Sequence, residues 1–406
     1  MKVLQINAVY GIGSTGRTVA EIDEVLKKHG IESIVATTQT TVNRDDIYIV
    51  GTKAERKLHA LLSRITGKQA YFSFFGTKRL IKWIKKEKPD VIHLRNLHAN
   101  YIHLGLLLKY IKKHNIATVI TLHDCWFFTG GCTHYTEQGC YKWETGCYQC
   151  PKIKSDNISW FFDRTPKTWK DRKDFLTSIS RLAVIGVSDW ITNEAKRSIL
   201  KDSTIITRIY NWIDLQVFYP RKEDVKEKYG LVRGQFSILC ISAGWKRNSF
   251  KFNQLLELSK KLDDDMQIVL VGAVEDNIFL PSNIKAIGYI HSIDELAKLY
   301  SSMDVYVHLS CEDTFGKVIA EAMACGTPAI VFNTTACPEL IGENCGYVVD
   351  VGDITAMCNA LETIKNKGKE CYSQHCIMFV REFFEKSMLI EQTKLLYEQL
   401  LKGATK

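Results

Sequence analysis

The chain has 406 residues, of which 46% are hydrophobic and 24% charged, so it is neither a disordered nor a fibrous protein. This length favours two domains, and no run of 18 apolar residues predicts a membrane-spanning helix. The net charge of +9 is concentrated in residues 51–90, where eleven Lys and Arg face three acids. Because the rest of the chain is nearly neutral, the composition argues against a general polyanion binder.

The first 210 residues alternate short apolar runs, which predict buried parallel strands, with longer amphipathic stretches, which predict helices. The predicted strands are Val3–Ala8, Glu32–Thr37, Val91–Leu94, Ala117–Leu122, Leu182–Val187 and Ile205–Tyr210. The first of these looks like a buried strand and lacks the longer apolar region and cleavage site of a signal peptide. With an odd number of cysteines, thirteen, we expect a cytoplasmic chain with reduced thiols.

Three glycines follow the first strand with the spacing Gly11-x-Gly13-x-x-Gly16. Glycines before a helix let the backbone approach a ligand, and a helix N-terminus favours anions. The acidic residue that a dinucleotide site needs after the second strand is missing, because Thr37 leads into further polar residues. We therefore predict a substrate or phosphate loop, with a plain tight turn and, less favoured, a dinucleotide site as the alternatives, and Gly13 and Ser14 are its candidate ligand contacts.

A histidine and a cluster of cysteines follow the strand Ala117–Leu122. His123 lies where we expect a strand end to meet a cleft and could hydrogen-bond a polar substrate, although a lone histidine at a strand end is more often structural. The Cys-rich loop 125–150 holds Cys125, Cys132, Cys140, Cys147 and Cys150, and the last four have the spacing C-x7-C-x6-C-x2-C. Four soft ligands with a close C-x2-C pair suit a structural zinc ion. An iron–sulfur cluster, plain thiols and a facultative disulfide are the alternatives.

A second series of apolar runs begins after Pro220. The predicted strands are Ser237–Ser242, Gln267–Val271, Ile284–Ile287, Val305–Leu309, Ala329–Val331 and Gly346–Val349. Helical stretches between them include Lys251–Leu262, Ile293–Ser301 and Lys317–Ala324, and 379–401 predicts one or two more helices. Two such series predict an α/β protein with two doubly wound Rossmann-like domains. In such sheets ligands bind beyond the carboxyl ends of the strands.

The strongest motif follows the strand Val305–Leu309. An acidic turn with Glu312 and Asp313 leads through Gly316 into a helix that carries Glu321. Asp313 and Glu321 can face one ligand, although a carboxylate at a helix N-terminus is more often only a cap.

This stretch resembles the signature of glycosyltransferase family 4, the retaining nucleotide-sugar transferases of the two-Rossmann-domain (GT-B) type. Other segments resemble the family in the same order, namely 13–16, 122–124, 187–190, 210–214, 269–272 and 337–340. The Cys-rich loop resembles that of a subset of exopolysaccharide and capsule enzymes. The resemblance implies an N-terminal acceptor domain (1–213), a donor domain (214–384) that faces it across a cleft, and a C-terminal helix (385–406) that packs back on the first domain.

The resemblance also implies roles for particular residues. His123 and Asp313 contact the transferred sugar, and Glu321 binds the ribose hydroxyls. Asp313 stands where the family usually has glutamate, so neighbouring Glu312 is an alternative for that contact. The family's Arg and Lys for the donor diphosphate have no direct match, and Arg247 and Lys251 are the candidates, with solvated loop charges as the alternative reading. The implied donor contacts are Gly13, Ser14, Arg247, Lys251, Gly288, Glu312, Thr314, Phe315, Gly316 and Glu321.

The expected function is transfer of a hexose, with retention, to a hydroxyl of a lipid-linked or growing surface glycan such as a capsule or lipopolysaccharide. No Asp-x-Asp motif ends a strand, so no metal cofactor is expected for catalysis. The helices expected at 54–65 and 78–88, with the aromatic residues 71–75 between them, suit an anionic membrane surface, although solvated lysine faces explain them too. A nucleotide-sugar epimerase or hydrolase is the alternative, and a zinc-stapled nucleic-acid binder a remote one.

Overall fold

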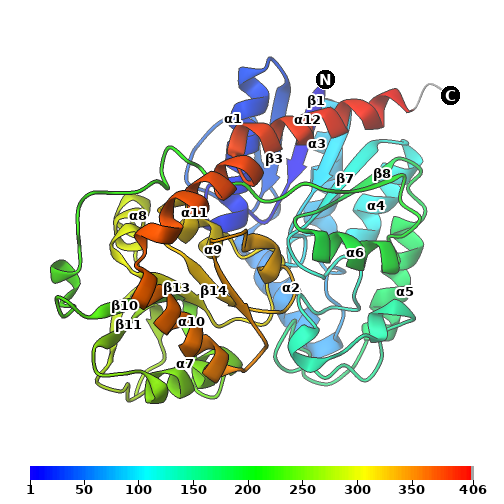
Figure 1. The fold of residues 1–406 in the computed structure, drawn as a ribbon. Helices are drawn as coiled ribbons and strands as arrows, with labels where there is room; N and C mark the ends of the chain where they lie inside the picture. Colours follow the sequence, from blue (N-terminus) through cyan, green and yellow to red (C-terminus); the bar gives the residue numbers. More distant parts are fainter. Residues whose placement is uncertain (404–406) are drawn as a thin grey trace. The chain divides into compact units, whose positions relative to one another are not determined.

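The computed structural model describes residues 1–403 and consists of two compact α/β units (Figure 1). The first unit comprises Met1–Ile209 and the part of α12 (Lys386–Lys402) that begins at Ile390. The second unit is Tyr210–Leu389. Each unit contains one main parallel sheet with helices on both faces, so the predicted α/β class with two Rossmann-like domains is confirmed. The sequence places the corresponding boundaries after residues 213 and 384.

The sheet of the first unit has seven parallel strands in the order β5-β3-β1-β6-β7-β8-β9. Its strands are β1 (Lys2–Ile6), β3 (Glu32–Thr37), β5 (Ile47–Ile49), β6 (Val91–Leu94), β7 (Ala117–Leu122), β8 (Leu182–Gly186) and β9 (Ile205–Arg208). A separate pair joins β2 (Val9–Tyr10) to β4 (Gln39–Thr40). The sequence does not predict β2, β4 or β5, because two or three residues are too few to show a strand periodicity.

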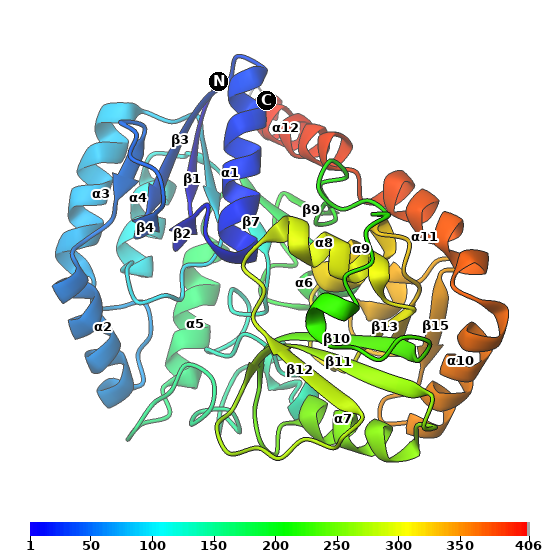
Figure 2. The ribbon, with the colours of Figure 1, turned by 90° about the vertical axis from the view of Figure 1, so that its left-hand side faces the viewer.

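Helices cover both faces of this sheet (Figure 2). They are α1 (Gly13–Lys28), α2 (Lys53–Thr66), α3 (Phe74–Glu87), α4 (Leu104–Lys113), α5 (Thr165–Leu176) and α6 (Asp189–Arg197). Gln5 on β1 donates to the carbonyl of Val19 in α1, and its sheet neighbour His93 on β6 bonds the hydroxyl of Tyr397 in α12 at 2.6 Å. Helices α1 and α12 therefore share one face, and α3, α4 and α5 pack in turn along the other.

The sheet of the second unit has six parallel strands in the order β12-β11-β10-β13-β14-β15. They are β10 (Phe236–Trp245), β11 (Met266–Val274), β12 (Ile284–Gly288), β13 (Val305–His308), β14 (Ala329–Phe332) and β15 (Gly346–Val349). Its helices are α7 (Phe250–Lys261), α8 (Ile293–Ser302), α9 (Lys317–Ala324), α10 (Ile354–Lys367) and α11 (Glu370–Phe383). Helix α7 packs on α10, whereas α9 packs on both α8 and α11, which gives one helical layer on each face.

The central strands of both sheets are almost fully buried, as their continuous apolar runs predict. Because all their neighbours are parallel, the loops that follow their carboxyl ends gather at one edge of each sheet. Within residues 1–403 no helix is both long and apolar enough to cross a bilayer.

Candidate active site

A cavity of about 330 Å³ lies at the carboxyl edge of the second unit's sheet. Strand β10 contributes Ile241, Ser242, Ala243 and Trp245 to its lining, and the loop after β13 contributes Leu309, Ser310, Glu312 and Asp313; Lys251, His308 and Val318 complete it. One cationic side chain, one histidine and two carboxylates thus converge, among apolar side chains, on a cavity at the edge where open α/β sheets bind ligands.

Asp313 is held in place by a histidine of the adjoining strand. The Nε2 atom of His308 lies 2.8 Å from Asp313 Oδ2, and its Nδ1 atom lies 2.9 Å from the hydroxyl oxygen of Tyr306. Burial opposes the charge on His308, but Tyr306 and the Asp313 carboxylate outweigh burial and raise its pKa well above the ordinary value. At neutral pH the pair is therefore an imidazolium that orients a carboxylate towards the cavity.

The same histidine belongs to the one group of three potential metal ligands that lie within 4.8 Å of each other among residues 1–403: His308, Asp313 and Cys337. Both ring nitrogens of His308 are already engaged by Tyr306 and Asp313. The group therefore fits a hydrogen-bonded network that positions Asp313 better than it fits a metal site.

The two candidate cations for a donor diphosphate occupy different positions. Lys251, in the first turn of α7, lines the cavity, and its Nζ bonds the hydroxyl of Ser242. Arg247 lies outside the cavity lining, and its Nη2 donates to the carbonyl of Asn277 at 2.6 Å while its backbone N–H binds Glu275. Of the two, Lys251 is the one that this conformation places beside the carboxylates.

The residues after Asp313 form a rigid entry into helix α9. Gly316 has φ +88°, and a Cβ atom there would lie 2.7 Å from Ile319 Cδ1, so the turn requires glycine. Phe315 packs edge-on against Phe384 at 5.2 Å and is buried, so its side chain is structural. Thr314 is buried as well. What this segment can offer a ligand is its backbone N–H groups at the start of α9.

Glu321 lies inside α9 and is only 5% exposed. Its Oε2 atom accepts a hydrogen bond from the buried hydroxyl of Tyr300 at 3.3 Å. Burial, reinforced by the Glu321 carboxylate, raises the pKa of Tyr300 well above its ordinary value, so the hydroxyl stays a donor. Neither Glu321 nor Gly288, the last residue of β12, lines the cavity, while Glu312 and Asp313 both do.

The first unit has its own set of candidates at the carboxyl edge of its sheet. His123 follows β7 directly, and the next residue, Asp124, is fixed by the Trp126 amide at 2.8 Å and by His98 Nε2 at 2.9 Å. Burial lowers the pKa of His98, but the Asp124 carboxylate outweighs it, and the net shift is upward. This pair fixes the loop that presents His123.

The glycine-rich loop begins α1 at this same sheet edge. Gly13, with φ +64°, is the first residue of the helix, and Ser14 is exposed in its first turn. The amide of Gly11 donates to the carbonyl of Gly16 at 2.9 Å, which closes the turn.

The four cysteines proposed as metal ligands, Cys132, Cys140, Cys147 and Cys150, lie in the irregular segment between β7 and α5. All thirteen cysteines lie within the described residues, and no disulfide joins any of them.

Of the residues that line the second unit's cavity, sequence reasoning named Lys251, Glu312 and Asp313 and missed the others, among them His308, Ser242 and Trp245. The signal for His308 was available, because a histidine that ends a buried strand five residues before an acidic turn is placed to reach it. Nothing in the pattern distinguishes Trp245, whose Nε1 donates to the carbonyl of Val271 at 2.9 Å inside the sheet, from a core tryptophan.

Comparison with known proteins identifies the family to which the chain belongs. The pattern described as Glycosyltransferase Family 4 matches residues 15–217, which is half of the chain. The chain belongs to glycosyltransferase family 4. The pattern described as Glycosyl transferases group 1 matches residues 235–366, so the two matches fall on the two units.

Two curated relatives of this family-4 chain illustrate its range. An N-acetyl-alpha-D-glucosaminyl L-malate synthase of Bacillus anthracis is 26% identical over 54% of this chain and 60% of its own. A putative colanic acid biosynthesis glycosyl transferase WcaC of Escherichia coli is 23% identical over 66% of this chain and 65% of its own. The matches thus span a little under two thirds of these relatives.

Solved structures share the fold at low sequence identity. The sucrose-phosphate synthase of Thermosynechococcus elongatus superposes with a TM-score of 0.72 at 17% identity, and the match covers 99% of both chains. HepE of Anabaena, in complex with UDP-glucose, gives a TM-score of 0.66 at 14% identity over 98% of this chain and 99% of that chain. The chain therefore has the GT-B fold that the sequence predicts.

Proposed function

We propose that this family-4 protein is a retaining glycosyltransferase that moves a hexose from a nucleotide-sugar donor to a hydroxyl of a lipid-linked glycan in surface polysaccharide synthesis. The observation that carries the proposal is the cavity of the second unit, where Lys251 lies beside Glu312 and Asp313. A diphosphate needs a cation, and a sugar needs carboxylate acceptors for its hydroxyls. The complex of HepE with UDP-glucose supports this donor class.

The reaction breaks the bond between the anomeric carbon and the donor diphosphate and forms a bond from that carbon to the acceptor oxygen on the same face. The acceptor proton passes to the leaving phosphate oxygen, so no enzyme nucleophile is required. Lys251 and the amides at the start of α9 would stabilise the charge that develops on the diphosphate. Asp313, oriented by His308, would bind the sugar, and Glu321 the ribose.

The acceptor would bind to the first unit, where His123 directly follows the central strand β7. A second cavity there, of about 260 Å³, has a polar lining that includes Arg64, Asn100, Asp156 and Asn157. It lies between α2 and the segment 155–158, so a glycan head group could hydrogen-bond in it.

The surface beside this cavity supports a membrane-bound acceptor. Trp160, Phe161 and Phe162 are 45%, 70% and 49% exposed, and the amide of Trp160 bonds the carbonyl of Arg64 in α2. Leu58 and Leu61 on α2 are exposed as well. Aromatic side chains next to a basic helix suit an anionic bilayer surface, so we propose reversible docking at the inner face of the plasma membrane.

The aromatic stretch 71–75 contributes less to this surface than its sequence suggests. Phe74 and Phe75 are 37% and 67% exposed, but Ser73 is buried, Phe72 packs against His59, and the hydroxyl of Tyr71 bonds Asp171 at 2.6 Å. The residues 158–162 therefore replace 71–75 as the main apolar component of the proposed membrane contact.

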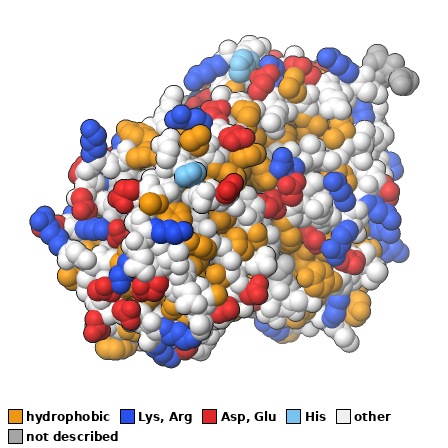
Figure 3. Space-filling model, viewed as in Figure 1, with side chains coloured by type: hydrophobic (Ala, Val, Ile, Leu, Met, Phe, Trp, Pro, Cys, Tyr) orange, Lys and Arg blue, Asp and Glu red, His pale blue; other side chains and the backbone are white. Residues whose placement is uncertain are grey.

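On the face shown in Figure 3, basic and acidic side chains are intermixed.

A panel of nucleotide sugars, read by nucleoside-diphosphate release with and without lipid-linked acceptors, tests the function. We expect release that depends on the acceptor, together with a new glycosidic bond of the donor's anomeric configuration. Release or epimerisation without an acceptor would instead indicate a nucleotide-sugar hydrolase or epimerase, and inversion at the anomeric carbon would refute the retaining mechanism.

A further inference from the structure

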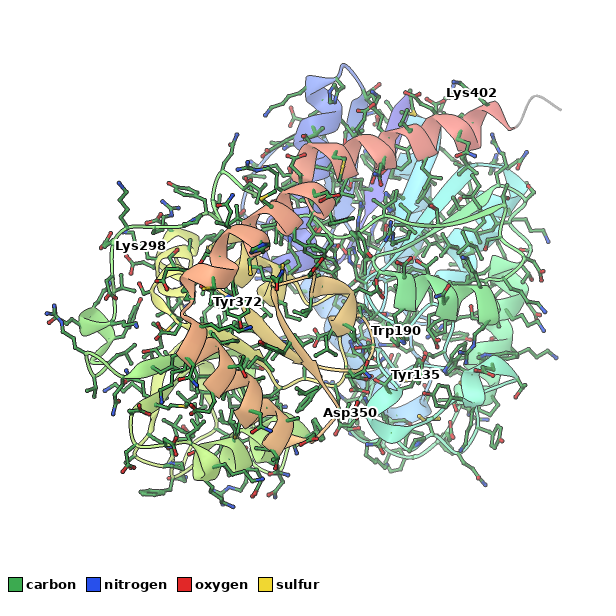
Figure 4. All side chains as sticks on the ribbon, in the orientation of Figure 1. Tyr135, Trp190, Lys298, Asp350, Tyr372 and Lys402 are labelled. Atoms are coloured by element: carbon green, nitrogen blue, oxygen red, sulfur yellow. The ribbon has the colours of Figure 1, made fainter. Side chains whose placement is uncertain are left out.

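The segment between β7 and α5, residues 123–164, is long and irregular, with only the short 3-10 helices η1 (Thr136–Gln138) and η2 (Lys142–Glu144). Its side chains hold it together: both the amide and the hydroxyl of Thr133 bond Asp156. Tyr135 lies beside Trp190 of α6, with ring centroids 6.3 Å apart (Figure 4). This segment is therefore ordered by side-chain contacts within itself and with α6, and its four cysteines are among the groups available for that purpose.

Cys132 and Cys147 adjoin the same turn, because the hydroxyl of Thr129 donates to the carbonyl of Cys132 at 2.7 Å and the next residue, Gly130, contacts Cys147. Cys140 and Cys150 lie in the same loop. No three of the four sulfurs lie within 4.8 Å in this conformation of residues 1–403, so a shared ion would draw them closer. Their common loop leaves the backbone room to do so, because Gly139 and Gly146 lie in open space between them.

One of the sulfurs already accepts a backbone hydrogen bond, because the amide of Gly130 donates to Cys147 Sγ at 3.1 Å. A Cβ atom on Gly130 would lie 2.7 Å from Cys147 Cβ, so the close approach depends on glycine. Backbone N–H groups aimed at sulfur stabilise negative charge there, as they do around metal-bound thiolates.

A buried cation adjoins the same cysteines. Arg172 of α5 is 2% exposed; its Nη1 donates to the carbonyls of Trp126 and Thr129, and its guanidinium lies 3.8 Å from the centroid of the Trp126 indole ring. Its Nη2 atom is buried without a hydrogen-bond partner. Among the described residues no Asp or Glu oxygen lies within 4.0 Å of its guanidinium nitrogens, and the groups that interact with it electrostatically are Tyr71, Cys147, Cys132 and the more distant carboxylate of Asp124. A buried charge of this kind requires a counter-charge.

We propose that Cys132, Cys140, Cys147 and Cys150 bind one zinc ion and that Arg172 neutralises the resulting tetrathiolate. Four thiols release four protons to solvent when they bind Zn²⁺, so the complex carries two negative charges. The orphan Nη2 of Arg172 supplies both a hydrogen bond and a positive charge to it. The ion would be structural, because four protein ligands leave no open coordination position.

The metal content of the reduced, untagged full chain tests the site directly. We expect one zinc per chain, and after exchange with Co²⁺ the visible spectrum of a tetrahedral tetrathiolate. The variants Cys140→Ser and Cys147→Ser should lose the metal, whereas Cys125→Ser, a buried cysteine of the same segment, and Cys371→Ser, an exposed cysteine on α11, should retain it. Metal-free reduced protein, an iron–sulfur spectrum or an octahedral cobalt spectrum would overturn the proposal.

The role of Arg172 has a separate test. We expect Arg172→Gln to weaken zinc binding at least tenfold in competition with a chelator, and Arg172→Lys, which restores the charge, to recover part of the loss. Lys173→Gln, at the next and exposed position, is the matched control and should not change zinc affinity. Equal zinc affinity in wild type and Arg172→Gln, with far-ultraviolet circular dichroism showing an intact fold, would refute the counter-charge role.

Discussion

The loop after β7 in the first unit and the loop after β13 in the second unit both leave the carboxyl end of a central strand, yet they are stabilised in opposite ways. The first runs from residue 123 to 164 and depends on hydrogen bonds within itself and on a buried arginine. The second runs only from 309 to 316, and the strand and helix on either side fix it.

The difference shows that a fold can position polar side chains either through the strand and helix beside a short loop or through contacts within a long one. In the short loop, His308 at the strand end sets the orientation of Asp313, and α9 begins four residues after Asp313. In the long loop the sheet determines only the first residues, His123 and Asp124, and everything beyond them needs supports of its own. Substitutions in the short loop should therefore affect chemistry first, and those in the long loop should affect local order first.

The largest effect is expected at Glu321. Glu321→Gln keeps the shape of the side chain and the contact with Tyr300, but removes the charge proposed to hold the ribose hydroxyls. We expect a loss of about 100-fold or more in kcat/KM, equivalent to about 2.7 kcal/mol. Glu257→Gln on the exposed face of α7 is the control. Turnover close to wild type in Glu321→Gln would remove this residue from the site.

The two carboxylates of the short loop should differ. Because His308 orients Asp313, we expect Asp313→Asn to lower kcat roughly 30-fold or more and Glu312→Gln to lower it less than fivefold. Asp313→Asn should also lower the pKa of His308 towards its ordinary value, which an NMR titration of the imidazole reports. The reverse order of activities would assign the sugar contact to Glu312.

Two glycine substitutions test how strongly each loop depends on its backbone conformation. Gly316→Ala places a Cβ 2.7 Å from Ile319 Cδ1 at φ +88°, so we expect a loss of about 2 kcal/mol in unfolding free energy and a raised donor KM. Gly139→Ala in the long loop, at φ +55° with open space around it, should cost about 1 kcal/mol and leave KM unchanged. Urea unfolding measures the stability of both variants, and donor titration measures their KM. Equal losses of stability would mean that the steric contact with Ile319 does not determine the effect of the substitution.

The pH dependence of stability should have opposite signs at two buried histidines. The pKa of His308 is raised in the folded state, so its stabilising contribution is complete below about pH 6.5 and is lost as pH rises through the folded pKa. The difference in unfolding free energy between wild type and His308→Gln should therefore shrink from pH 6 to pH 9. A constant difference over this range would contradict the charged pair with Asp313.

His59 in α2 should behave in the other way, because burial, with a minor contribution from His103, lowers its pKa to about 4. Between pH 6.5 and pH 4 the unfolded state binds the proton and the folded state does not. Stability should therefore fall as pH falls, by up to about 1.4 kcal/mol per pH unit. His59→Asn should make the dependence in this range shallower, which urea unfolding at a series of pH values can measure.

The smallest effect on the fold is expected from charge neutralisation on α3. Lys82, Lys85, Lys86 and Lys88 are all exposed, and replacing them with Gln should release the protein from anionic vesicles without changing donor affinity or stability. Replacing Lys260 and Lys261 on α7 by Gln is the control and should leave vesicle binding unchanged. If vesicle binding survives in the α3 variant, the charge there is only a solvated helix face.

Most of the fold could be predicted because buried parallel strands leave long apolar signatures. The ranges Glu32–Thr37, Val91–Leu94, Ala117–Leu122 and Gly346–Val349 agree with β3, β6, β7 and β15 to the residue. The motif around Asp313 also predicts the carboxyl edge of the second sheet, where Glu312 and Asp313 line the cavity, because helix and strand signals frame it on both sides.

Loop conformation is what the sequence could not provide. Arg247 and Lys251 stand four residues apart in the sequence, yet only Lys251 lines the cavity, because the turn directs Arg247 to the carbonyl of Asn277. Arg172 was equally hidden, since an arginine in a polar helical stretch looks solvated until α5 is seen to bury it against Trp126. Such outcomes depend on contacts between distant segments, which local patterns do not contain.

The bond between His93 and Tyr397 has a consequence for how the chain acquires its structure during synthesis. His93 lies in the middle of the first sheet, and both partners of this bond are buried. A ribosome delivers Tyr397 only after every residue of the second unit has been made. Until the last turns of the chain emerge, the imidazole of His93 and the apolar face under α12 are therefore uncovered in the first unit. A nascent chain paused before residue 390 should accordingly be a better substrate for chaperones than its length alone suggests.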